Sequence, residues 1–127
     1  MYKIKLYDNK NEQKSIIRNI SCADTFPKRL LGLMGKNKFN GLIFKQKHQS
    51  KYYNSIHTSF MKVPIDILYI NNQMKIHELT TLNPWQLYIP KKGNIKYIIE
   101  LPEKSINKHN IKINDKVVIT HERQKNW

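Results

Sequence analysis

The residues best suited to chemistry lie in one stretch, residues 55–66, of this 127-residue chain. Alternate side chains of an extended segment share a face, so Ser55, His57 and Ser59 lie together while Thr58 faces the other way. A histidine among hydroxyl groups can act as a general base or donate a hydrogen bond to a ligand. This stretch is therefore the first candidate for a functional site.

Two carboxylates, Asp66 and Glu100, each stand inside an otherwise apolar run. Because an unpaired buried charge is costly, each carboxylate should have a partner. Arg29 and the imidazole of His57 are the natural partners. The sequence therefore predicts that Arg29, His57, Asp66 and Glu100 lie close together.

Two interpretations of this set stay open. In the first, the four residues form an internal network of ion pairs and hydrogen bonds that docks a helix on a sheet. In the second, they line a polar pocket in which Arg29 binds an anion and His57, next to Thr58, acts as a base or ligand donor. The chain has no nucleophile elbow, phosphate-binding loop or zinc-protease pattern. No catalytic residue, metal ligand or cofactor is predicted, and an enzyme is not the favoured class.

The elements that would position these residues are mostly strands. One short helix is predicted near residues 25–34, because Asp24 and Thr25 are good N-caps and Gly35 can end it. Strands that recur every 8–12 residues without alternating helices favour a single-domain β sandwich or barrel over residues 1–127. Strands are predicted at residues 2–7, 13–20, 41–44, 54–60, 65–70, 74–79, 95–101 and 116–121, and a single helical turn at 105–109.

The chain is strongly basic, with 23 lysine and arginine residues against 9 acidic ones and a formal net charge of +14. Such a charge attracts polyanions without specificity, and loop aromatics such as Trp85 and Tyr88 could stack on bases. Only three of the basic residues are arginines, however, and they are spread along the chain. A solvated basic surface is therefore the plainer interpretation, and nucleic-acid binding is the alternative.

Neither the cysteine content nor the hydropathy points to export or to a membrane. Cys22 is the only cysteine, which excludes an internal disulfide. No apolar stretch approaches the roughly 18 residues that a transmembrane helix needs. The N-terminus alternates polar and apolar residues and contains no apolar signal-peptide core, so the cytoplasm is the default compartment. Export of a trimmed mature chain stays an open alternative.

Four motifs in order resemble the "domain of unknown function 192" family. The similarity covers about residues 22–120 and implies a compact, jelly-roll-like β sandwich or barrel with a short helix, but no established activity. The motifs are Phe26-x-x-Arg29-x-x-Gly32-Leu33-Met34, Gly41-Leu42-Ile43-Phe44, Ile56-His57-Thr58-x-Phe60-Met61-x-x-Pro64-Ile65-Asp66-Ile67-Leu68-Tyr69 and Ile98-Ile99-Glu100-Leu101-Pro102.

The sequence departs from the family pattern toward its C-terminus. The family tends to have glycines in the turns that end in Gly-Asp, whereas this chain has Lys104, Asn110 and Asn114, and keeps Asp115. Asparagine tolerates left-handed backbone angles, so two of these turns can survive. Lysine fits such a position poorly, so a change in loop shape is expected at Lys104.

Three hypotheses follow for the function. The first is a non-catalytic accessory domain that binds a small anionic ligand or a protein partner near Arg29, His57 and Asp66. The second is a basic nucleic-acid-binding protein. The third is a small hydrolase-like enzyme with His57 as general base.

Overall fold

The computed structural model describes residues 1–22, 40–46, 56–57 and 63–122, and the backbone alone at 56–57. These residues are mostly strand, as predicted. The predicted helix near 25–34 lies outside the described residues. The elements in chain order are β1 (Tyr2–Tyr7), β2 (Gln13–Cys22), β3 (Leu42–Lys45), β4 (Ile56–His57), β5 (Ile65–Asn71), β6 (Ile76–Leu82), β7 (Leu87–Tyr88), β8 (Ile95–Pro102), α2 (Ser105–Lys108) and β9 (Lys116–His121).

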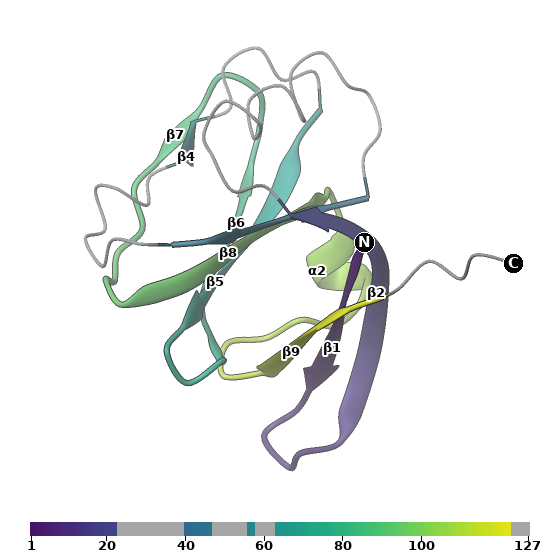
Figure 1. Cartoon of the computed structure of the whole chain (residues 1–127). Coiled ribbons are helices and arrows are strands. Elements are labelled where there is room, and N and C mark those ends of the chain that lie inside the picture. The colour runs from purple at the N-terminus through teal and green to yellow at the C-terminus, as the bar shows by residue number, and fades with distance from the viewer. Residues whose placement is uncertain (23–39, 47–55, 58–62, 123–127) are drawn as a thin grey trace, which may run out of the picture.

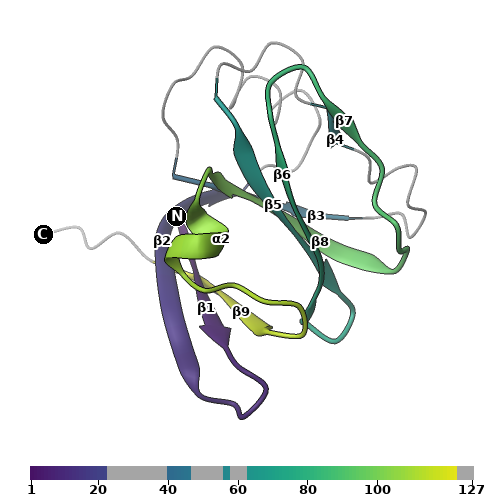
Figure 2. The same ribbon diagram turned by 180° about the vertical axis from the view of Figure 1, so that it is seen from behind.

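Seven of these strands form one sheet, in the order β6-β5-β8-β3-β2-β1-β9, while β4 and β7 pair separately. Within the sheet β2 and β3 run parallel, and the other neighbouring strands are antiparallel. The sheet bends so that β1, β2 and β9 face β5, β6 and β8, and α2 lies beside the gap between the two halves (Figures 1 and 2). The mainly β fold, predicted as a sandwich or barrel, is confirmed and takes the form of one strongly bent sheet, whereas this strand order does not confirm the jelly-roll likeness.

The two edge strands of the sheet, β6 and β9, meet at one end. Lys75 and Lys116 form an antiparallel bridge there. The Ile76 amide donates to the Asp115 carbonyl at 2.9 Å, and the Asn114 amide donates to the Ile76 carbonyl at 2.7 Å. The turn before β9 therefore closes the barrel and removes part of the exposed sheet edge.

The central strands β5 and β8 are apolar on both faces, so they bury side chains on both sides of the sheet. We call the two resulting clusters the inner core, inside the barrel, and the outer core, on its outside. The inner core comprises Ile4, Leu6, Ile20, Ile43, Leu68, Ile70, Ile76, Ile99, Leu101, Ile111 and Val117. The outer core comprises Leu42, Phe44, Ile65, Ile67, Tyr69, Leu82, Ile95 and Ile98, with Tyr88 of β7 packed against it.

The β5–β6 hairpin shows how the local sequence sets a strand boundary. The Asn71 side-chain oxygen accepts the amides of Gln73 and Lys75 at 3.0 Å each, which builds the predicted tight turn. Met74 has a φ of 59°, so β6 begins at Ile76, two residues later than predicted. Strand β7 was not predicted, because two residues give too short a pattern to recognise.

The three family glycine positions all have left-handed backbones in this chain. Asn110 has a φ of 51° and Asn114 a φ of 74°, which confirms that asparagine can keep these turns. Lys104 has a φ of 70° and a ψ of 3° directly before α2, so it does take the conformation that lysine was expected to avoid. The Cβ atom makes this conformation strained, and lysine lacks the short polar side chain with which asparagine offsets the cost.

We expect Lys104→Gly to raise the free energy of unfolding by about 0.5–1 kcal/mol, because glycine adopts this conformation without strain. Urea unfolding would measure the change. Lys108→Gly, inside α2, is the matched control and should lower stability by a similar amount. Equal destabilisation by both substitutions would show that the Lys104 backbone is not strained.

Candidate functional site

Asp66 and Glu100 lie on the adjacent strands β5 and β8, and each is only 1% exposed. In the register of these strands Asp66 stands opposite Leu101, and Glu100 stands opposite Ile67. Leu101 belongs to the inner core and Ile67 to the outer core. The two carboxylates therefore point to opposite faces of the sheet, and the predicted convergence does not hold for this pair. A register offset of one residue is enough to separate them.

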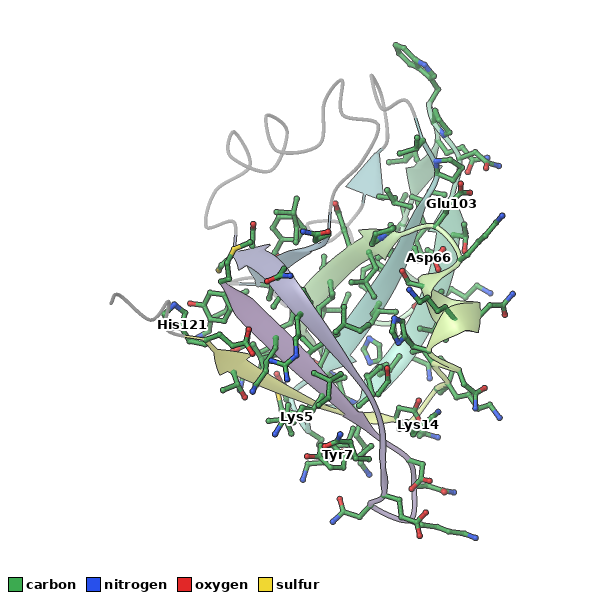
Figure 3. All side chains as sticks on the ribbon, turned by 90° about the vertical axis from the view of Figure 1, so that its right-hand side faces the viewer. Lys5, Tyr7, Lys14, Asp66, Glu103 and His121 are labelled. Carbon is green, nitrogen blue, oxygen red and sulfur yellow. The ribbon has the colours of Figure 1, made fainter. Side chains whose placement is uncertain are left out.

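Asp66 ties the sheet to α2. Its Oδ1 accepts a hydrogen bond from the Thr81 hydroxyl at 2.8 Å, and its Oδ2 accepts one from the Ile106 amide at 2.8 Å. The carboxylate thus satisfies an amide in the first turn of the short helix, which has no intrahelical partner of its own. Figure 3 shows Asp66 beside this helix. Asp66 thus docks α2 on the sheet, while the two partners expected from the sequence, Arg29 and the His57 side chain, lie outside the described residues.

Glu100 lies on the outer face, in the middle of an apolar surface. Besides Ile67 on β5, it stands opposite Leu42 on β3. A carboxylate at this depth keeps its charge only where a cation or several donors stabilise it. A guanidinium on this face, such as that of Arg29, would stabilise the Glu100 carboxylate.

A second carboxylate of the outer face, Glu78 on β6, was missed by the sequence reasoning. It is 8% exposed. The Tyr88 hydroxyl donates to Oε2, the Lys91 amide donates to both oxygens at 2.9 and 3.1 Å, and the Lys92 amide donates to Oε1 at 3.3 Å. Glu78 therefore fixes β7 and the following turn against the barrel. The feature of the sequence that could have identified Glu78 is its position as the one acidic residue in the strand predicted at 74–79.

Burial, followed by the hydrogen bond to Glu78, raises the pKa of Tyr88 to about 12. The folded state thus holds this proton more tightly than the unfolded chain, whose tyrosine pKa is about 10. The stabilisation is complete below pH 10 and is lost as the pH rises from 10 toward 12.

We expect Tyr88→Phe to lower the free energy of unfolding by about 1 kcal/mol near neutral pH, because Glu78 loses its hydroxyl donor. The difference from the wild type should shrink as the pH rises from 10 to 12. Urea unfolding of both proteins over this range would measure it. A difference that stays constant across the range would contradict the assigned role of Tyr88.

His57 belongs to β4, where its backbone stands opposite Leu87 of β7, and Ile56 stands opposite Tyr88. Because Tyr88 packs on the outer core, β4 lies on the outer side of the barrel, as Figures 1 and 2 also show. His57 is therefore on the side of the sheet to which Glu100 points, and not on the Asp66 side. Arg29 and Thr58 lie outside the described residues.

A polar hollow of about 540 Å³ lies between the β5–β6 turn and the segment before β8. Burial lowers the pKa of His77, one of its lining residues, so this imidazole is neutral near pH 7. Within the described ranges no group of three or more His, Cys, Asp or Glu residues could hold a metal ion. The lining residues are Asn71, Asn72, Gln73, His77, Lys92, Gly93 and Asn94.

Comparison with known proteins places the chain in a family. The model of DUF192, described as "Uncharacterized ACR", matches residues 7–119. The chain belongs to the DUF192 family. A UPF0127 protein of Pyrococcus abyssi is 35% identical over 109 residues, which cover 84% of this DUF192 chain and 92% of the relative. A UPF0127 protein of Thermococcus sibiricus is 36% identical over 110 residues, which cover 86% and 71% of the two chains.

Two solved structures share the fold of this DUF192 chain. A putative transcription regulator from Sinorhizobium meliloti has a TM-score of 0.76 at 14% identity and covers 92% of both chains. A protein of unknown function from Novosphingobium aromaticivorans has a TM-score of 0.73 at 16% identity, covering 91% of this chain and 83% of the other.

None of the described helices is long and apolar enough to cross a membrane.

Proposed function

We propose that this DUF192 chain is a non-catalytic binding domain whose site lies on the outer side of the barrel and takes a small anionic ligand. The observation that carries the proposal is Glu100, a carboxylate that is 1% exposed on the face where β4 lies. Arg29 is the cation of matching chemistry, since a guanidinium can bind a buried carboxylate and still offer donors to a second anion.

The roles within the site follow from this arrangement. Glu100 orients Arg29, Arg29 binds the ligand anion, and His57 and Thr58 donate hydrogen bonds from the β4 region. Asp66 contributes indirectly, because its two oxygens hold Thr81 and α2. It supports the barrel and does not contact the ligand.

Thermal-shift screening against small anions at about 0.15 M salt tests this function, because a ligand of the native state raises the melting temperature. Arg29→Ala and Thr58→Ala should each weaken binding of the anion that stabilises the wild type most. Arg29→Lys should bind that anion only slightly better than Arg29→Ala, because lysine lacks the planar guanidinium. Glu100→Gln should weaken binding, whereas Glu103→Gln, at an exposed carboxylate of the same segment, should not. Stabilisation that is insensitive to Arg29 and Glu100 would rule this site out.

A second candidate function is nucleic-acid binding. It is supported by the net charge of +14 and by the similar fold of a protein named as a putative transcription regulator. Binding of this kind should fall steeply with salt and be unaffected by His57→Ala. Anisotropy titrations of labelled oligonucleotides at two salt concentrations separate it from the anion pocket.

A further inference from the structure

Three large apolar side chains project from one short segment next to β7. Trp85 is 65% exposed, Leu87 63% and Ile89 43%. In the described residues the other exposed large apolar side chains are Met1 and Ile113, which lie elsewhere in the chain. A cluster of this kind indicates an interaction surface. We call residues 83–90 the apolar arch.

The apolar arch is firmly anchored, so its exposure is not that of a loose loop. Leu82 and Pro90 are buried at its two ends. Tyr88 turns toward the barrel and donates to Glu78, which also accepts the amides of Lys91 and Lys92. Because successive residues of an extended segment face opposite ways, holding Tyr88 inward directs Leu87 and Ile89 outward.

Trp85 adds a second sign of a functional surface. Its φ is 64°, a left-handed conformation that is unfavourable for a bulky residue. Strain of this kind persists where the surrounding structure imposes it, and it is concentrated at functional sites. Here it occurs at the most exposed of the three apolar side chains.

The charge around the apolar arch indicates what it contacts. Lys91 and Lys92 follow it directly and are exposed, and the whole chain carries a net charge of +14. Such a charge disfavours a second copy of this chain and favours an anionic surface. Leu87 and Ile89 have no ring to stack on a base, whereas all three apolar side chains suit the boundary between lipid headgroups and acyl chains.

We propose that the apolar arch docks on an anionic lipid surface. Trp85, Leu87 and Ile89 enter the headgroup–acyl boundary, while Lys91 and Lys92 contact the anionic headgroups. Stable attachment to a membrane surface generally needs two such signals, one apolar and one electrostatic. The proposal does not rest on the anion pocket near Glu100, although β7 of the apolar arch pairs with β4 of that pocket.

Vesicle co-sedimentation of the full chain tests the proposal. Phosphatidylcholine vesicles with about one third phosphatidylserine should bind the protein, and pure phosphatidylcholine vesicles should bind it far less. The double variant Leu87→Ser/Ile89→Ser should bind at least about tenfold more weakly. Ile113→Ser, at an apolar residue that is 47% exposed elsewhere, is the matched control and should bind like the wild type.

Two further variants separate the contributions of charge and insertion. Lys91→Ala/Lys92→Ala should weaken binding to the anionic vesicles about tenfold at low salt, and less at high salt. In a Trp127→Phe background Trp85 is the remaining tryptophan, and its fluorescence should shift to the blue on vesicle binding. Unchanged vesicle binding by Leu87→Ser/Ile89→Ser, no blue shift, or a Trp85 signal that responds to oligonucleotides and not to vesicles would each overturn the proposal.

Discussion

Replacing Asp66 by alanine is expected to lower the free energy of unfolding by about 3 kcal/mol. The substitution leaves the partly buried Ile106 amide and the Thr81 hydroxyl without the acceptor that the buried Asp66 carboxylate provides, and unmade hydrogen bonds away from water are costly. It also removes the hydrogen bond that ties the first turn of α2 to β5. Urea unfolding would measure the loss, and hydrogen exchange at the Ile106 amide would locate it.

Thr81→Val is the matched control for Asp66→Ala. It removes one of the two donors to Asp66 and leaves the contact with Ile106, so it should cost only about 1 kcal/mol. The Ile106 amide should exchange much faster in Asp66→Ala and little faster in Thr81→Val. If the two substitutions cost the same and leave Ile106 equally protected, Asp66 does not hold the helix. In that case its contribution to ligand binding would have to be reconsidered.

Most strands could be predicted because their information is local. The alternation at β1, the apolar runs of β5 and β8, and the Asn71 turn all depend on residues close together in the chain. The single turn at α2 was predicted in the same way. By contrast, the parallel pairing of β2 with β3 joins segments about 20 residues apart, and no local pattern specifies it.

The candidate site was predictable in its residue types and not in its geometry. The rule that buried carboxylates need partners correctly singled out Asp66 and Glu100 as buried. Their faces depend on the β5–β8 register, which the strand sequences do not fix because both strands are apolar on both sides. Glu78 was missed for a related reason, since its partners are a hydroxyl and backbone amides 10 to 14 residues further along the chain.

The second large effect is expected at the ion pair that anchors the barrel-closing turn before β9 to β2. Lys14 Nζ lies 2.7 Å from Asp115 Oδ2, and the two side chains are only 13% and 6% exposed. Asp115 Oδ2 also accepts the Lys112 amide at 2.8 Å, and Lys14 donates to the Asn110 carbonyl. We therefore expect Asp115→Ala to cost about 3–4 kcal/mol and Lys14→Met about 2–3 kcal/mol in urea unfolding.

The Arg18–Glu122 ion pair, on the same half of the barrel, is the matched control. Arg18 is 54% exposed, so Arg18→Met should change stability by less than about 1 kcal/mol. Lys14→Met/Asp115→Ala should cost clearly less than the sum of the single substitutions, because the two groups interact directly. Additive costs would mean that Asp115 acts through the Lys112 turn alone. The closure of β6 on β9 would then depend on backbone contacts, and the salt bridge would contribute little to it.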